Sequence, residues 1–150
     1  MPKLEIELVP ESVWGQNLRS LLSKNEWDSL RKMCYRKAGY KCEICGSTGR
    51  RHPVECHEVW EYAKGIQKLR GLIALCPACH LVKHFGFAQV NGKAAEALKH
   101  LGKVNHWNQR QVQAHVAEAF DLWAARSKRQ WKSDISWIDT QIREYSGNSG

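Results

Sequence analysis

Apolar residues recur at helical spacing at both ends of the chain. The first predicted helix covers about residues 25–39, with Asn25 as its N-cap and Gly39 as its C-terminal stop. Its apolar positions fall at i, i+3, i+7 and i+11, namely Trp27, Leu30, Cys34 and Ala38. This pattern predicts an N-terminal amphipathic helix whose apolar face, Cys34 included, packs in the core.

The C-terminal part of the chain is predicted to form a helical extension over about residues 93–145. A short helix over residues 93–101 is expected to end at Gly102. Asn105 or Asn108 can cap a longer helix, whose apolar stripe consists of Val112, Val116, Ala119 and Trp123. We expect this stripe to pack on the rest of the domain, or to form the interface of a homodimer or of a complex with a protein partner.

Two stretches between the helical regions are apolar and β-branched enough to form strands. They cover residues 53–60 and about 66–75, and the loop between them ends in Lys64-Gly65. We expect these two strands to pair as a β-hairpin. Together with the helices, it predicts one α+β domain over residues 1–150, in which a small hairpin is embedded in flanking helices.

The charge balance adds a class of partner to this picture. Lys and Arg number 23 against 15 Asp and Glu, for a formal net charge of +8, and such an excess suits a polyanion such as nucleic acid. No apolar run approaches the roughly 20 residues that span a bilayer, and the first residues lack the apolar core of a secretory signal. We therefore expect an intracellular, cytoplasmic protein that does not act on a membrane.

Four of the six cysteines form two C-x-x-C pairs, Cys42/Cys45 and Cys76/Cys79. Two such knuckles supply the four thiolates of a structural zinc site. The interval between them is longer than the roughly 15–20 residues of a simple zinc ribbon, so the hairpin is inserted there. Because four thiolates complete one zinc ion, we expect Cys56 to be a small buried apolar residue.

Three histidines predict a second metal site. His80 and His84 are one helical turn apart and directly follow a zinc cysteine, so they share a helix face. His57 on the facing strand supplies a third imidazole. Three protein ligands leave open coordination positions, as a catalytic metal requires for water and a substrate oxygen. Three imidazoles favour Zn²⁺, Ni²⁺ or Mn²⁺ over Mg²⁺, which prefers oxygen ligands.

The order of these motifs resembles that of the HNH (ββα-metal) endonucleases. The resemblance covers about residues 34–86 and rests on C-E-I-C-G, V-E-C-H-E-V-W and L-C-P-A-C-H-L-V-K-H. It implies a hairpin and a helix that hold one divalent ion over the scissile phosphate, with a four-cysteine zinc bracing them. The implied activity is hydrolysis of DNA to 5′-phosphate and 3′-hydroxyl ends.

The resemblance also implies roles for two hairpin residues. His57 matches the metal ligand, and Glu58 matches the general base, which is usually a histidine in the family. An ordinary glutamate has a pKa well below neutrality, which suits a general base poorly. Two alternatives remain open: His57 is the base and Cys56 a ligand, or His52 supplies the imidazole. If none of these residues acts as the general base, the chain is a catalytically inactive, zinc-braced module that binds nucleic acid or protein.

Basic residues around the hairpin are candidates for contacts with the phosphates of double-stranded DNA. They are Arg50, Arg51, Lys64, Lys68, Arg70 and Lys83. Lys128, Arg129 and Lys132, close to Trp131 in the sequence, can form a further basic arm, although packing of the tryptophans also explains that segment.

Overall fold

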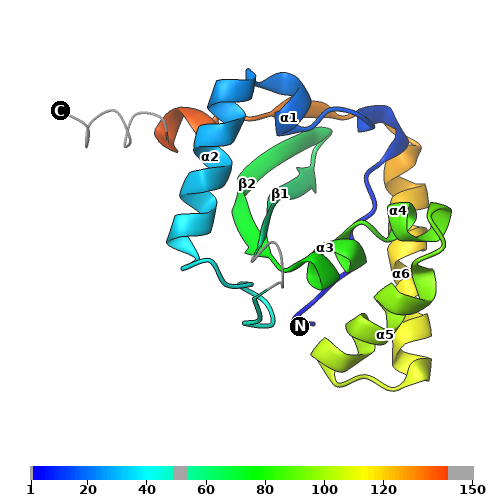
Figure 1. Cartoon of the computed structure of the whole chain (residues 1–150). Helices are drawn as coiled ribbons and strands as arrows, with labels where there is room; N and C mark the ends of the chain where they lie inside the picture. Colours follow the sequence, from blue (N-terminus) through cyan, green and yellow to red (C-terminus); the bar gives the residue numbers. More distant parts are fainter. Residues whose placement is uncertain (1, 49–53, 142–150) are drawn as a thin grey trace.

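The computed structural model describes residues 2–48 and 54–141 and has a mixed α+β fold (Figure 1). Its helical elements are η1 (Glu11–Val13), α1 (Leu18–Leu21), α2 (Lys24–Lys37), α3 (Pro77–Lys83), α4 (Phe85–Val90), α5 (Ala94–Asn105) and α6 (Gln109–Ser127). Its strands are β1 (Glu55–Ala63), β2 (Ile66–Leu75) and β3 (Lys132–Asp134). The predicted α+β class is confirmed. Within the described ranges, no helix has the length and apolar character that crossing a membrane requires.

The hairpin forms as predicted but is longer on its first strand. β1 and β2 are antiparallel, and the predicted end of the first strand at residue 60 is wrong because pairing continues to Ala63 opposite Ile66. The turn is therefore only Lys64-Gly65, and both residues have positive φ, 51° and 78°. This is the conformation that matches the twist of a two-residue hairpin loop. The pairing shifts by one residue between Val59 and Trp60.

β3 was not predicted and pairs in parallel with the beginning of β2. It is three residues long and polar (Lys-Ser-Asp), so it carries no period-2 apolar signal. It also corrects the predicted helical extension over residues 93–145, because the chain turns into a strand after α6 and becomes helical again only at residue 137.

The N-terminal helix is confirmed, but its cap is not Asn25. Ser23 caps α2 by accepting a hydrogen bond from the Glu26 N–H, and the Glu26 side chain accepts one from the Ser23 N–H. This capping box pairs two otherwise free amides. Gly39, with φ of 64°, follows the last turn as predicted. α2 packs on the hairpin through Trp27 and Leu30, which are buried with Leu69 of β2.

Gly102 does not end a helix. α5 continues through it to Asn105, and His106 adopts the left-handed conformation at the C-terminus. A Cβ on Gly102 would lie 3.2 Å from Val112 Cγ2 and 3.3 Å from the Trp107 carbonyl oxygen. The missing side chain therefore lets α5 and α6 approach closely. Of the two proposed caps for α6, Asn108 is the one used.

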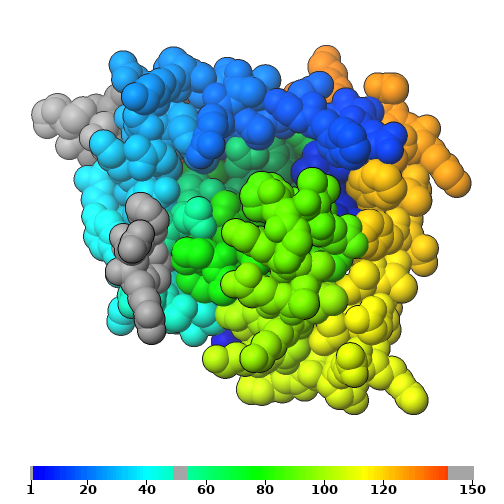
Figure 2. Space-filling model, turned by 45° about the vertical axis from the view of Figure 1, so that its right-hand side comes forward, coloured from blue at the N-terminus to red at the C-terminus, as the bar shows by residue number. Residues whose placement is uncertain are grey.

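The N-terminal segment crosses between α3, α5 and α6. Asn105 binds the backbone of Leu4 through both its carbonyl oxygen and its amide nitrogen, and the Ile6 N–H donates to His115 Nε2 at 3.0 Å. The Glu7 N–H donates to the Lys83 carbonyl. The segment then meets the end of α6, where the Glu11 N–H donates to Ser127 Oγ. In Figure 2 these N-terminal residues (blue) adjoin the end of α6 (orange).

Candidate metal centres and the adjoining cavity

The four knuckle cysteines form one cluster, as predicted. The sulfurs of Cys42, Cys45, Cys76 and Cys79 all lie within 4.8 Å of one another, and three of the residues are buried. In each knuckle the N–H of the second cysteine points at the sulfur of the first, Cys45 N to Cys42 Sγ at 3.5 Å and Cys79 N to Cys76 Sγ at 3.4 Å. Amides aimed at sulfur stabilise a thiolate. This cluster can bind a structural zinc ion.

The first knuckle is attached to the hairpin through Glu43. Its N–H donates to the Ala74 carbonyl at 2.9 Å, and its carboxylate accepts from the Ala74 N–H at 2.7 Å. The second knuckle begins where β2 ends, and Cys76 is also the N-cap of α3. Gly46, with φ of 77°, provides the left-handed turn after Cys45. The cysteine cluster thus joins the end of β2 to the start of α3.

The imidazoles of His57, His80 and His84 form a second cluster, with nitrogens within 4.8 Å of one another. His57 is buried on β1, His80 lies on α3, and His84 is the residue between α3 and α4. His84 Nε2 is 3.0 Å from His80 Nε2. The side chain of His84 is exposed at the surface, but partial desolvation of its imidazole and the neighbouring imidazoles of His80 and His57 lower its pKa to about 4. It is therefore neutral at physiological pH, with a lone pair for a cation.

Carboxylates stand behind two of these imidazoles. Glu7 Oε2 is 2.8 Å from His57 Nε2, and Glu55 Oε1 is 3.4 Å from His80 Nδ1. Carboxylates behind ligand histidines fix the tautomer and the ring orientation in metal sites. Burial alone would raise the pKa of Glu7, but the His57 hydrogen bond and the Lys83 charge outweigh it and lower that pKa to about 2. The donor set therefore fits a divalent cation.

Glu7 was missed by the sequence analysis. It lies 50 residues before His57 in the chain, and no motif connects the two. The only available signal was a pair of acidic residues, Glu5 and Glu7, that alternate with apolar residues in the stretch Leu-Glu-Ile-Glu-Leu.

We expect Glu7→Ala to weaken binding of Ni²⁺ or Co²⁺ at the histidine cluster by about 10- to 100-fold, the usual effect of losing a carboxylate that orients a metal-binding histidine. Isothermal titration of zinc-loaded protein measures it. Glu5→Ala is the matched control, because Glu5 is on the same segment without contacting a histidine of the cluster. Equal affinities for wild type and Glu7→Ala would show that Glu7 does not support the cluster.

Glu58 lies beside His57 but has different partners. Its Oε1 accepts from the Leu18 N–H at 2.7 Å, and its Oε2 accepts from Trp60 Nε1 at 2.9 Å. Burial raises its pKa despite these two hydrogen bonds. The pKa of Glu58 is therefore closer to the neutral values that suit a general base than the pKa of an ordinary glutamate is.

Cys56 is partly buried. Among the described residues, it belongs neither to the four-cysteine cluster nor to the histidine cluster. Its contact with Cys34 and its burial raise the pKa of its thiol, so it stays protonated. This agrees with the expected packing role. The other hairpin candidate, His52, lies outside the described residues.

The predicted phosphate-binding residues have different surroundings. Lys64 and Lys68 are exposed at the hairpin. Arg70 is ion-paired with Glu61. Lys83 is buried, with its Nζ 2.8 Å from Glu7 Oε1. Its ammonium is therefore bound inside the protein and not displayed at the surface. Arg50 and Arg51 are outside the described residues.

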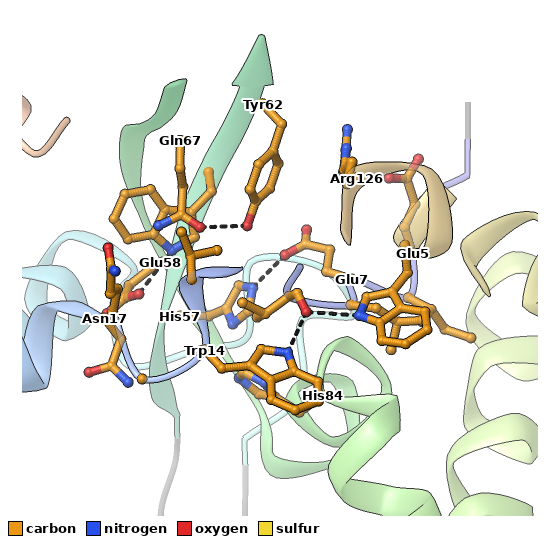
Figure 3. Close-up of a pocket in the computed structure, with 18 of the residues that line it drawn as sticks. Glu5, Glu7, Trp14, Asn17, His57, Glu58, Tyr62, Gln67, His84 and Arg126 are labelled. Carbon is orange, nitrogen blue, oxygen red and sulfur yellow. Dashed lines mark hydrogen bonds and ion pairs between the residues drawn. The ribbon is translucent and has the colours of Figure 1, made fainter. Parts of the chain in front are cut away.

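A cavity of about 590 Å³ opens beside the histidine cluster (Figure 3). His57, His84, Glu7 and Glu58 line it, together with aromatic and basic side chains that include Trp14, Trp123, Tyr62 and Arg126. The Val9 carbonyl accepts hydrogen bonds from both indoles, Trp14 Nε1 at 2.7 Å and Trp123 Nε1 at 3.0 Å. The cavity thus brings the carboxylates of Glu5, Glu7 and Glu58 and the candidate metal centre together in a space accessible to a ligand.

Comparisons of the chain with protein-family models, with curated proteins and with solved structures give no match.

Proposed function

We propose that the chain is a metal-dependent endonuclease of the HNH type, which hydrolyses DNA phosphodiester bonds at the histidine cluster. The observation that carries the proposal is that three imidazoles, from a hairpin strand and from the following helix and its C-terminal end, meet and line one cavity. The adjacent four-cysteine cluster supports it, because a zinc ion there would brace the same hairpin and helix into a ββα-metal core.

Each residue has a role in this reaction. His57, His80 and His84 would hold the cation, and Glu7 and Glu55 orient two of these imidazoles. A divalent ion bound there would supply positive charge that stabilises the negative charge developing on the phosphate in the transition state. Glu58 takes a proton from the attacking water while the water oxygen bonds to phosphorus. The bond from phosphorus to the 3′ oxygen breaks, and the 3′ oxygen takes up a proton from solvent, so that the products are a 5′-phosphate and a 3′-hydroxyl.

Nicking of supercoiled plasmid tests the proposal. Zinc-loaded protein is incubated with Mg²⁺, Mn²⁺, Ni²⁺ or Zn²⁺, and we expect nicking with one or more of the last three, because imidazole ligands favour them over Mg²⁺. Ligation of the products without prior end treatment checks for 5′-phosphate and 3′-hydroxyl ends. No cleavage with any ion would reject the enzyme and leave the alternative, a zinc-braced binding module.

Glu58→Gln tests the general base. We expect it to lower the cleavage rate by about 10²- to 10⁴-fold, the usual contribution of a positioned base, while metal affinity stays unchanged. The rate of the wild type should rise with pH as Glu58 loses its proton, above the ordinary carboxyl range because its pKa is raised. If the Glu58→Gln protein cleaves at the wild-type rate and the His52→Ala protein does not cleave, the general base is His52.

A further inference from the structure

Basic residues from two distant parts of the chain meet at the tip of the hairpin. Lys64 is in the turn, and residues 126–132 run from the last residues of α6 to the first residue of β3. The Lys132 N–H donates to the Gly65 carbonyl at 2.8 Å, and Lys132 pairs with Ile66 in the sheet. Arg129 lies so near the turn that a Cβ on Gly65 would be 3.1 Å from its Nη2. β3 therefore joins the two basic groups into one surface.

Aromatic rings hold the arginines of this surface in place. The Arg126 guanidinium lies 4.5 Å from the centre of the Tyr62 ring, and that of Arg129 lies 4.9 Å from the Trp131 ring. The two rings meet edge to face at 5.3 Å, and Trp131 Nε1 donates to the Arg126 carbonyl at 2.8 Å. Stacked guanidiniums lose less entropy when they bind an anion than free side chains do.

We call Lys64, Arg126, Lys128, Arg129 and Lys132 the hairpin-tip surface. Within the described ranges none of the five forms an ion pair, and four of them are exposed. Nearby acids have other partners, since Glu61 pairs with Arg70 and Asp134 accepts from the Ser136 N–H. The surface is thus a local excess of positive charge.

The hairpin-tip surface is continuous with the cavity. Arg126 and Tyr62 line the cavity that also contains His57, and Figure 3 shows both above Glu7. Residues 126–132 are part of the orange segment at the upper right of Figure 2, on the outside of the molecule. A chain of phosphates passing the histidine cluster would therefore meet further cations along this side.

We propose that the hairpin-tip surface binds the phosphates of the DNA whose scissile bond lies at the histidine cluster. This inference rests on the proposed function, but it concerns binding and not cleavage. A polynucleotide fits better than an isolated anion, because the charges extend from the cavity wall to the tip. Phosphate contacts of this kind give affinity and register without reading the base sequence.

The test is DNA binding by zinc-loaded protein with no other divalent ion added, so that cleavage plays no part. The variant is Lys64→Gln/Arg129→Gln/Lys132→Gln. Its control is Lys99→Gln/Lys103→Gln/Arg110→Gln, which removes the same charge from exposed positions of α5 and α6. Fluorescence anisotropy of a labelled DNA duplex, measured over a range of salt concentrations, gives the affinity and its salt dependence.

We expect the slope of log K against log salt to become shallower by about 0.9 per lost contact, or about 2.7 for the hairpin-tip variant, with little change for the control. Equal losses in the two variants would overturn the proposal, because they would indicate only a net-charge effect. So would tighter binding of anionic phosphatidylserine vesicles than of DNA through the same three residues. If binding follows the expectation and no ion supports nicking, only the proposed nuclease activity fails.

Discussion

Replacing Cys79 with serine is expected to remove zinc from the protein and to unfold most of it at physiological temperature. Cys79 is fully buried, and its sulfur lies against the other three thiols and 3.2 Å from His100 Nε2. A serine hydroxyl is a poor zinc ligand and leaves a buried polar group. Structural zinc provides about 10–16 kcal/mol of apparent binding free energy in small zinc domains, comparable with the whole stability of a domain.

Elemental analysis for zinc and thermal unfolding by circular dichroism measure this effect. Cys34→Ala is the matched control, because Cys34 is a buried cysteine of α2 outside the four-cysteine cluster. It should retain one zinc ion per chain and lose only about 1–3 kcal/mol through packing. A Cys79→Ser protein that keeps its zinc and its melting temperature would show that the cluster is not a structural metal site.

His57→Ala and His84→Ala are each expected to lower plasmid cleavage by about a thousandfold or more. Each removes one of three imidazoles, and the charge that a cation supplies to a transition state is typically worth several kcal/mol, with 1.36 kcal/mol per tenfold change in rate. His84 matters although it lies beyond the last residue of α3, since its Nε2 still reaches His80 Nε2. The fold should persist, because the cysteine cluster is unchanged.

Binding of Ni²⁺ or Co²⁺, measured by isothermal titration, should be lost together with cleavage in both variants. His106→Asn is the control, because His106 is exposed and has φ of 55°, a conformation that asparagine tolerates. Cleavage by His57→Ala at the wild-type rate would mean that the active site is located elsewhere in the chain.

Local sequence patterns were sufficient to predict most of the helices and strands. Periodicity predicted α2 and α6, the β-branched stretches predicted the hairpin, and C-x-x-C spacing predicted the cysteine cluster. These features depend on residues close in the chain or on ligand types with few alternatives. Two errors occurred where local signals competed: Ser23 outcompeted Asn25 as a cap, and Gly102 serves helix packing instead of ending α5. β3 was missed for another reason, because its short polar sequence carries no period-2 apolar pattern.

The sequence by itself therefore determined the fold class and the residues able to bind metal, because both follow from side-chain type and spacing. Only the tertiary structure placed Glu7 behind His57, raised the pKa of Glu58 through burial, enclosed the ammonium of Lys83 and joined Lys64 to Lys132 through β3. Each of these relations links segments far apart in the chain. Their distances are set by packing of the whole domain, which no local pattern of residues records.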